Sequence, residues 1–428
     1  MTNLSRRSLL GGVAAGGAVA VAGPAHRAGA ARPAGHVVLL ALDGFDHAYL
    51  DGRVPMPNLW ALARRGTLTR GTGVMATFTN PSWTSVSCGT WPDVTQNAAY
   101  WWDEAAGVAR GQSRDSAVEG LGQSLRRQGK TIGSAQWFIM QDKGVSYGDP
   151  GGLYTQPGGR IDARVDDAIA MITGAPVRSG GTTVRLPAPP DFLAVYSSDI
   201  DGDGHSYGPN PPEIRSALAE TDRAIGRLVQ AFKDADLFGR TTWIATADHG
   251  MSEWRIPQGP QALASLAAAG FRAEIVGSGG RLRSTDTQVV LVSGGSTSVH
   301  LRSGLQGDPA AVAGVRSALL GVEGVTAALD KGDQGELRMA PQYGELVIET
   351  AEPYSLFLTP PADGADGRHG GRDELDVPFL LAGHRVRPNS APRAPRHVDV
   401  APTISTLLGV DPPAASGGRV LAESLFDR

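Results

Sequence analysis

The fold class follows first from one stretch near the start of the chain, Val37-Val38-Leu39-Leu40-Ala41-Leu42-Asp43-Gly44. Its six apolar residues show no polar alternation, which is typical of a strand buried on both faces of a sheet. Three similar runs follow, at 192–196, 242–247 and 377–382. Amphipathic helical stretches alternate with these runs, so we expect an α/β fold with a doubly wound, mostly parallel sheet flanked by helices.

A helix is predicted between the second and third runs. It follows Pro211-Pro212, and proline is tolerated in the first turn of a helix but not in its interior. Apolar residues then recur at helical spacing: Ile214, Leu218, Ile225, Leu228, Val229 and Phe232. This segment is expected to be a crossover helix between two parallel strands.

The composition changes between about 251 and 350, where Gly and Ser are frequent. Short apolar runs at 288–292, 298–301 and 346–349 predict an inserted α+β lobe, and runs of the core type resume after it. We therefore expect a signal peptide at 1–30, a catalytic core from 31–250 and 351–428, and a lobe at 251–350. The Gly-rich segment 97–190 is expected to cover the functional site.

Composition excludes some classes of function. The chain has 428 residues, of which 41% are hydrophobic and 19% charged, as in an ordinary soluble domain. Its formal net charge is -4 and it contains four lysines, with no basic stripe. A nucleic-acid polymer is therefore not expected as a partner.

The first thirty residues are typical of an export signal. Arg6-Arg7 precedes Leu9-Leu10 and a Gly/Ala/Val run that ends near Ala30, a pattern that resembles a twin-arginine signal. We expect the protein to be secreted, periplasmic or on the cell surface, and to meet a membrane only through the export machinery. Cys88 is the only cysteine, so no intrachain disulfide can form, and its apolar setting favours packing.

Aspartate and histidine gather where the predicted strands end. Asp43 follows the first run, Asp248-His249 ends the third, and His369 precedes the last; Asp199 to His205 follows the second run and contains four acidic or imidazole side chains. Ligands bind beyond the carboxyl ends of strands in open α/β sheets. Carboxylate oxygen and imidazole nitrogen are ligands that Zn²⁺ accepts, so the joint pattern predicts a metal site.

A hydroxyl nucleophile is the second candidate feature. Thr79-Asn80-Pro81 enters a predicted helix that includes Trp83 and ends near Gly89. The free N–H groups at a helix start attract an anionic phosphoryl group, and a nearby metal would lower the pKa of the hydroxyl. Taken alone, Thr79 is most simply interpreted as a helix cap, and only the pattern of Asp and His residues favours a nucleophile.

These motifs, in this order, resemble the alkaline phosphatase superfamily, in its nucleotide pyrophosphatase/phosphodiesterase and phosphonoacetate hydrolase branch. The resemblance covers most of 36–250 and 355–410, including Asp399-Val400-Ala401-Pro402-Thr403 near the end. It implies two divalent metal ions, with zinc as the usual metal. One ion would be bound by Asp201, His205 and His369, and the other by Asp43, Asp248, His249 and the Thr79 hydroxyl. Asp199 and Asp203 are expected to lie in loop structure and to support the ligands.

The resemblance also implies a mechanism. Thr79 would attack a phosphate ester, a phospho-threonine intermediate would form, and water would release the product. Asn80 is a candidate for stabilising the phosphoryl charge, and a turn-forming role before Pro81 is the alternative. Asn97 is a substitute candidate for the oxygen-stabilising Asn of related enzymes. The predicted substrate is a small phosphate or phosphonate ester.

Two other functions stay open. The Phe78-Thr79-Asn80-Pro81 string resembles phosphonoacetate hydrolases, which hold the substrate carboxylate with lysines. Lys143 is the nearest candidate, and a surface role is the favoured alternative for it. An inactive ligand-binding member of the fold is the second alternative. Sulfatase chemistry is excluded because the required Cys/Ser-x-Pro-x-Arg string is absent, and the predicted export signal and Thr79 argue against a cytoplasmic phosphoglycerate mutase.

Overall fold

A computed structural model describes residues 35–302 and 304–426 of the chain. The predicted export signal at 1–30, with Arg6-Arg7, lies outside the described residues. Among the helices within these two ranges, none combines the length and apolar character that a membrane crossing needs.

The core is a seven-stranded sheet that contains all four predicted apolar runs. Its order is β2 (Gly66–Thr72), β20 (Asp376–Gly383), β10 (Thr241–Thr246), β1 (His36–Leu42), β9 (Phe192–Ser197), β5 (Ile132–Ala135) and β6 (Gly152–Thr155). The five strands from β10 to β6 are parallel, whereas β20 runs antiparallel to both of its neighbours. The predicted mostly parallel α/β fold is confirmed.

Strand β1 shows why the apolar runs are uninterrupted. Val38, Leu40 and Leu42 belong to the hydrophobic cluster on one face of the sheet, and the alternate residues of the same strand belong to the cluster on the other face. Successive side chains of a strand point to opposite faces, so a strand covered on both faces needs apolar residues throughout.

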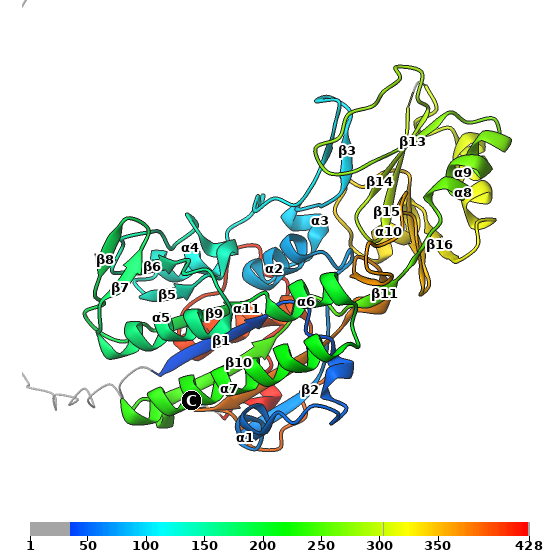
Figure 1. Cartoon of the computed structure of the whole chain (residues 1–428). Helices are drawn as coiled ribbons and strands as arrows, with labels where there is room; N and C mark the ends of the chain where they lie inside the picture. Colours follow the sequence, from blue (N-terminus) through cyan, green and yellow to red (C-terminus); the bar gives the residue numbers. More distant parts are fainter. Residues whose placement is uncertain (1–34, 303, 427–428) are drawn as a thin grey trace, which may run out of the picture. The chain divides into compact units, whose positions relative to one another are not determined.

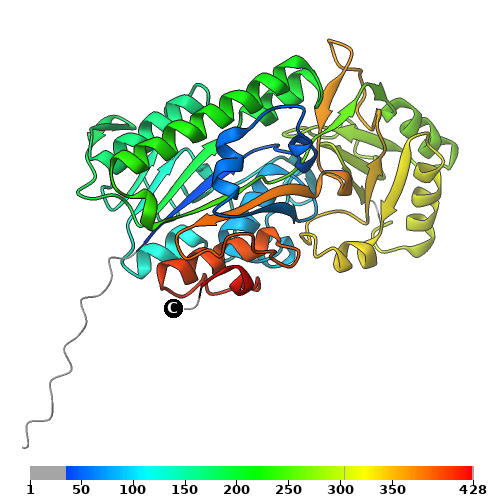
Figure 2. The same ribbon diagram turned by 90° about the horizontal axis from the view of Figure 1, so that it is seen from below.

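Helices cover both faces of this sheet (Figures 1 and 2). One face packs against α1 (Pro57–Ala63), α5 (Ile161–Thr173) and α7 (Pro212–Asp234). The other packs against α2 (Thr79–Cys88), α4 (Leu121–Arg127) and α11 (Val400–Leu408). Figure 2 shows α7, in green, and α11, in red, on opposite sides of the sheet. Helix α7 is the predicted crossover helix, and Pro212 is its first residue.

A second sheet lies within the segment expected to form a lobe. Its order is β13 (Ala273–Val276), β14 (Val289–Ser293), β15 (Thr297–Leu301), β17 (Leu346–Thr350) and β16 (Val325–Leu329). Helices α8 (Gly259–Ala268) and α9 (Pro309–Leu320) pack on one face. The three predicted runs of this segment are β14, β15 and β17. The boundaries at 251 and 350 stay a prediction.

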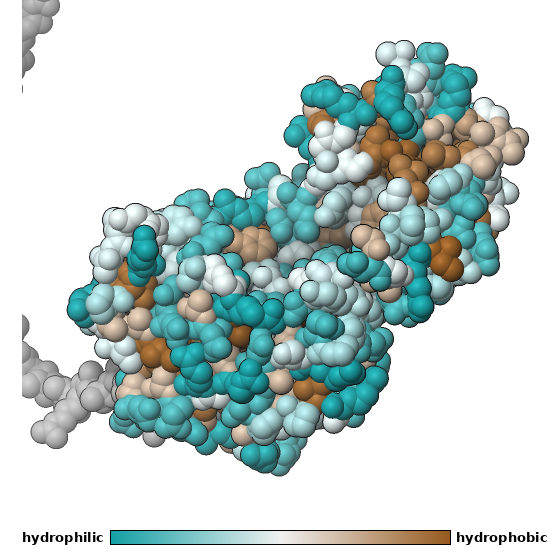
Figure 3. All heavy atoms as spheres, in the orientation of Figure 1, coloured by the Kyte–Doolittle hydropathy of each residue, from teal (hydrophilic) through white to brown (hydrophobic). Residues whose placement is uncertain are grey.

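The hairpin of β3 (Trp101–Asp103) and β4 (Val108–Arg110) covers part of the other face of this sheet. Trp102 and Ala109 pack against Val290 and Val292 of β14. The hairpin belongs to the 97–190 segment, so that segment contacts the second sheet as well as the core. Figure 3 shows hydrophobic residues gathered over the second sheet and its helices, while the surface over α7 is mostly hydrophilic.

Short elements connect the two sheets. The pairs are β11 (Ser252–Trp254) with β19 (Asp366–Arg368) and β12 (Ile256–Pro257) with β18 (Tyr354–Ser355). A third pair, β7 (Val177–Ser179) with β8 (Thr182–Val184), is a hairpin beside β6 of the core sheet. The remaining α-helices are α3 (Pro92–Thr95), α6 (Asp199–Tyr207) and α10 (Lys331–Glu336). Helix α6 corrects the loop expected around Asp199 and Asp203: the chain after β9 is helical there.

Candidate active site

The predicted ligands come together where three neighbouring strands end. Asp43 follows β1, α6 follows β9, and Asp248-His249 follows β10. Because β1 lies between β9 and β10 and is parallel to both, these strand ends meet at one edge of the sheet. His369 follows β19, which pairs with β11 beyond β10.

The six side chains form two groups in which the possible ligand atoms lie within 4.8 Å of one another. Asp201, His205 and His369 form the first group, and Asp43, Asp248 and His249 form the second. In the first group, one turn of α6 separates Asp201 from His205, whose Nε2 lies 3.4 Å from Oδ1 of Asp201. The Nε2 atoms of His205 and His369 are 3.1 Å apart.

Asp201 lies between the two groups. Its Oδ1 atom is 3.8 Å from Nε2 of His369 and 4.0 Å from Nε2 of His249. The rings of His249 and His369 stack, with centroids 3.6 Å apart. The two groups are therefore immediate neighbours, as a two-metal site requires.

The carboxylates of these two groups have buried oxygens that could bind a cation. One oxygen of each carboxylate, Oδ1 of Asp43, Oδ1 of Asp201 and Oδ2 of Asp248, is buried and has no hydrogen-bond partner among the described residues. Burial and then the charge of Asp201 raise the pKa of Asp43 to about 8, and burial raises the pKa of Asp201 to about 7. Buried carboxylates of this kind are held by metals or by paired donors, so the residues fit divalent cations.

The histidines fit the same interpretation. Burial lowers the pKa of His249 to about 3 and lowers that of His369 well below its ordinary value, which keeps both rings neutral. Metal-binding histidines are neutral and are oriented by a hydrogen bond from the other ring nitrogen. Each ring here has Nδ1 within 3.0 Å of a backbone carbonyl oxygen, which accepts from it: Thr77 for His369, Gly250 for His249 and Gly367 for His205. All three Nε2 atoms therefore face the cluster.

Two donors orient the second group. The hydroxyl of Tyr196, near the end of β9, donates to Oδ2 of Asp43, and the Gly44 N–H donates to Oδ1 of Asp248 at 3.2 Å. Tyr196 is 6% exposed. Each carboxylate thus has one oxygen held by the protein and one oxygen directed at the cluster.

Thr79 is the first residue of α2, and Phe78 is the N-cap, so the structure does not use Thr79 as the cap. Its Oγ1 lies 3.2 Å from Nε2 of His249, which places the hydroxyl beside the second group. Pro81 occupies the first turn of the helix, and Cys88 is its buried last residue, as the sequence predicted.

Asn80 and Asn97 hold the loop that follows β4. The Asn80 N–H donates to Oε1 of Gln112, and its side-chain amide donates to the Ser113 carbonyl, both at 2.7 Å. The Asn97 amide donates to Oγ1 of Thr84 at 2.9 Å and to the Asp115 carbonyl at 2.8 Å. Their roles in stabilising phosphoryl charge stay predictions.

Lys143 also contacts this loop, because its ammonium group donates to the Arg114 carbonyl. Its predicted contact with a substrate carboxylate stays a prediction. Asp199 accepts from the Ile161 N–H at 2.6 Å, and Asp203 pairs with Arg160 at 2.9 Å. Both carboxylates attach α6 to the start of α5 and so support Asp201 and His205.

Three residues of the site are not marked by any motif in the sequence. Tyr196 ends an apolar run, Thr77 acts through its carbonyl group, and Gln112 lies in a segment without a legible motif. For Tyr196, the only indication in the sequence is its position at the end of a strand, directly before an Asp-rich segment.

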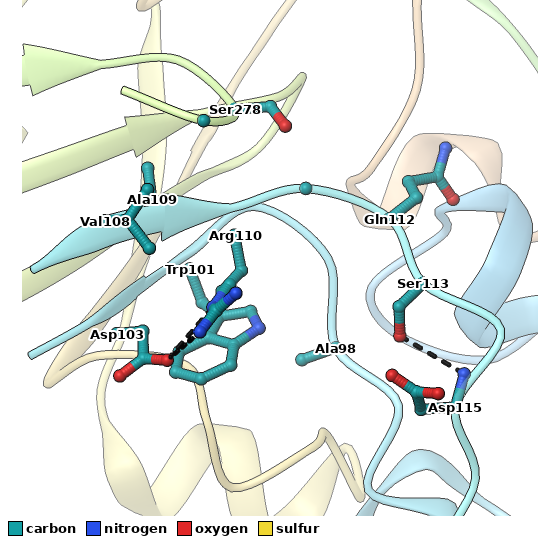
Figure 4. Close-up of a pocket in the computed structure, with 12 residues that line it drawn as sticks. Ala98, Trp101, Asp103, Val108, Ala109, Arg110, Gln112, Ser113, Asp115 and Ser278 are labelled. Atoms are coloured by element: carbon teal, nitrogen blue, oxygen red, sulfur yellow. Dashed lines mark hydrogen bonds and ion pairs between the residues drawn. The ribbon is translucent and has the colours of Figure 1, made fainter. Parts of the chain in front are cut away.

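A cavity of about 600 Å³ lies beside the Asn80 contacts. Figure 4 shows its two sides: Trp101, Asp103 and Arg110 of the β3–β4 hairpin on one side, and Gln112 and Ser113 on the other. Arg110 is paired with Asp103 at 2.7 Å, and Ser278, in the loop between β13 and β14, also lines the cavity.

The doubly wound sheet and the paired Asp/His groups define an α/β protein with a candidate two-metal site and a helix-borne hydroxyl. The model of the family "Type I phosphodiesterase / nucleotide pyrophosphatase" matches residues 37–372. The chain belongs to this family, which is metal-dependent, and the predicted branch of the alkaline phosphatase superfamily is confirmed.

Individual relatives agree with this assignment. Bis(5'-adenosyl)-triphosphatase enpp4 of Xenopus laevis is 26% identical over 239 residues, covering 51% of this chain and 47% of the relative. Human ectonucleotide pyrophosphatase/phosphodiesterase family member 7 is 27% identical over 228 residues, covering 50% and 48%. The chain therefore spans about half the length of these curated relatives.

A solved structure shares the fold. Murine ectonucleotide pyrophosphatase/phosphodiesterase 5, in an inactive threonine-to-alanine variant in complex with AMP, superposes with a TM-score of 0.67 at 18% identity. The superposition covers 88% of this chain and 96% of the murine chain.

Proposed function

We propose that this protein is a metal-dependent phosphoric ester hydrolase that cleaves phosphodiesters or nucleotide-type esters through a phospho-threonine intermediate on Thr79. The proposal rests mainly on one observation: the Thr79 hydroxyl lies 3.2 Å from Nε2 of His249, beside two adjacent groups of Asp and His side chains. A relative named a bis(5'-adenosyl)-triphosphatase and a murine relative with bound AMP support a nucleotide-type substrate.

Asp201, His205 and His369 would hold one divalent cation, and Asp43, Asp248, His249 and the Thr79 hydroxyl the other. The mixed oxygen and nitrogen donors favour zinc. When bound, the cations neutralise charge on the phosphoryl oxygens and lower the pKa of a hydroxyl or water.

The protein's own groups then account for the chemistry. Oγ1 of Thr79 forms a bond to phosphorus as the ester oxygen leaves, and the alcohol product takes up a proton. Water next attacks phosphorus, the bond to Oγ1 breaks, and the Thr79 hydroxyl is restored. Thr79 begins α2, so the positive end of the helix dipole stabilises the negative phosphoryl group throughout.

The test is a parallel assay on purified protein with p-nitrophenyl phosphate, its bis ester and phosphonoacetate, together with metal analysis. We expect about two metal ions per chain, turnover of the bis ester, loss of turnover with a chelator and recovery with zinc. Cleavage of phosphonoacetate alone would replace the proposal by carbon–phosphorus hydrolysis. Metal content without turnover of any ester would favour a binding protein.

We also propose export through the twin-arginine route, on the basis of Arg6-Arg7 and the small-residue run that follows. A double Arg→Lys substitution at positions 6 and 7 is expected to leave the protein in the cytoplasm on cell fractionation. Unchanged export of that variant would refute the twin-arginine assignment.

A further inference from the structure

One backbone donor beside the proposed nucleophile is held by an exposed side chain. Asn80 follows Thr79 in the first turn of α2, where N–H groups have no partner within the helix. Pro81 has no N–H, which leaves few donors at this end. The Asn80 N–H donates to Oε1 of Gln112 at 2.7 Å, and Gln112 is exposed.

Gln112 lines the cavity and also contacts one of the aromatic residues that pack beside the Asp/His groups. It lines the cavity opposite Asp103 (Figure 4). Its side chain is hydrogen-bonded to Tyr100, whose ring packs on Phe78 with centroids 4.8 Å apart. Phe78 in turn packs edge-on against His369, with centroids 5.8 Å apart.

The donor that Gln112 occupies is one that a phosphoryl group on Thr79 would use. The start of a helix favours an anion over a neutral acceptor, and hydrogen bonds to an ionised acceptor are about twice as strong as those between neutral groups. A phosphoryl oxygen therefore competes with the Gln112 amide for the Asn80 N–H and is the stronger acceptor.

We propose that Gln112 is a substrate-displaced stopper: its amide oxygen caps the Asn80 N–H in the resting protein, and a phosphoryl oxygen of the substrate replaces it. The inference rests on the proposed function of Thr79. The neighbouring contact allows the exchange without movement of the loop, because the Asn80 side chain independently donates to the Ser113 carbonyl at 2.7 Å. Only the Gln112 side chain has to turn away.

The test compares Gln112→Ala with Gln112→Glu in the metal-loaded full chain, using inorganic phosphate as a competitive inhibitor of bis-p-nitrophenyl phosphate hydrolysis. Removing the competing acceptor in Gln112→Ala should tighten the phosphate inhibition constant by about three- to tenfold. The charged acceptor in Gln112→Glu should weaken it by about tenfold or more. The value of kcat/KM for the bis ester should change in the same order.

Gln261→Glu is the matched control, because Gln261 is an exposed glutamine of α8 and its substitution makes the same charge change. It should leave the inhibition constant unchanged, and thermal unfolding should show that all three variants fold. Phosphate inhibition that is weaker or unchanged in Gln112→Ala would overturn the stopper and assign Gln112 to loop structure or direct binding. If the wild-type protein neither binds phosphate nor hydrolyses any ester, the proposed function is refuted as well. If the wild-type protein is active but the inhibition constants of the two Gln112 variants do not follow the expected order, only the stopper role of Gln112 is refuted.

Discussion

The imidazole rings of His249 and His369 lie face to face, with centroids 3.6 Å apart and planes inclined by 10°. His249 belongs to one group of Asp and His side chains and His369 to the other, so the stacked rings lie where the two groups meet. Two protonated rings would repel at this distance, and burial lowers the pKa of both. A substitution that moves one ring should therefore alter the geometry of both groups.

Asp201 and Asp203 provide a test of the ligand assignment within one helix. Asp201→Asn removes the carboxylate that lies between the two groups, so we expect loss of about one metal ion per chain and of most activity. Asp203→Asn is the matched control, because Asp203 is in neither group and the amide oxygen of Asn can still accept from Arg160, which keeps α6 attached to α5. Elemental analysis of both variants checks the expectation, and equal metal content in the two would contradict the assignment of Asp201.

Thr79→Ala should reduce turnover of the bis ester by about 10³-fold or more, because the attacking oxygen is removed. Asp43, Asp248 and His249 remain, so metal content and thermal stability should change little. Thr183→Ala, at an exposed position of β8, is the control and should be fully active. Retained turnover in Thr79→Ala would end the nucleophile assignment.

Tyr196→Phe should weaken metal affinity by about tenfold, since the hydroxyl orients Asp43 and orienting groups around metals typically contribute that much. Titration of metal-free protein with zinc measures this effect without reference to activity. Tyr154→Phe is the control: Tyr154 is also buried, in β6 of the same sheet, and its hydroxyl contacts only Gln156 at 3.4 Å among the partners described. The same zinc affinity in both variants would show that Tyr196 has only a packing role.

His300 should make the protein less stable as the pH falls. Burial, and then the charge of Lys331, lower the pKa of His300 to about 3 from its ordinary value of 6.5. Between pH 6.5 and pH 3 the unfolded chain binds a proton at His300 that the folded protein does not bind. For each unit by which the pH is lowered in this range, His300 therefore reduces the free energy of unfolding by about 1.4 kcal/mol.

Urea denaturation at pH 7 and at pH 4.5 of wild type and His300→Gln measures this contribution. The Gln oxygen can accept the Trp102 N–H that His300 accepts at 3.0 Å, so the variant should fold. The loss of stability on acidification should be smaller in the variant by about 2 to 3 kcal/mol. An equal loss in both proteins would show that His300 is not kept neutral by the fold.

The strands that were predicted share a physical property. Those at 37–42, 192–196, 242–247 and 377–382 are buried on both faces and therefore have sequences that are apolar except for the β-branched Thr242 and Thr246. Strand β5 was missed because its sequence, Ile132 to Ala135, contains Gly and Ser. A Cβ at Gly133 would lie 2.8 Å from the sulfur of Met171 on α5, so the small residue permits close packing that no local pattern reveals.

The direction of β20 was also not predictable, because apolar runs do not record whether a strand is parallel to its neighbour. Helix α6 was hidden for a related reason: Gly202 and Gly204 predict a loop. A Cβ at Gly204 would lie 2.8 Å from Cε of Met251, so packing of the helix explains this glycine.

At the site, the six Asp and His side chains could be predicted to lie together because each is near the end of a core element. Tyr196 and Thr77 could not be assigned, since one acts through a hydroxyl at the end of an apolar run and the other through a backbone carbonyl. Neither contact leaves a spacing pattern in the sequence. Contacts between segments far apart in the chain, such as Asn80 with Gln112, require the three-dimensional structure.

The position of β1 between β9 and β10 has a consequence for how the protein matures. Asp43 directly follows β1, and the two neighbouring strands, at 192–197 and 241–246, come about 150 and 200 residues later in the sequence. His369 comes later still. Closing such long loops is slow compared with forming local structure. The donor sets proposed for the two cations are therefore incomplete in a nascent or half-formed chain. Metal uptake should be the final event of folding, and cells short of the metal should accumulate a folded but empty precursor.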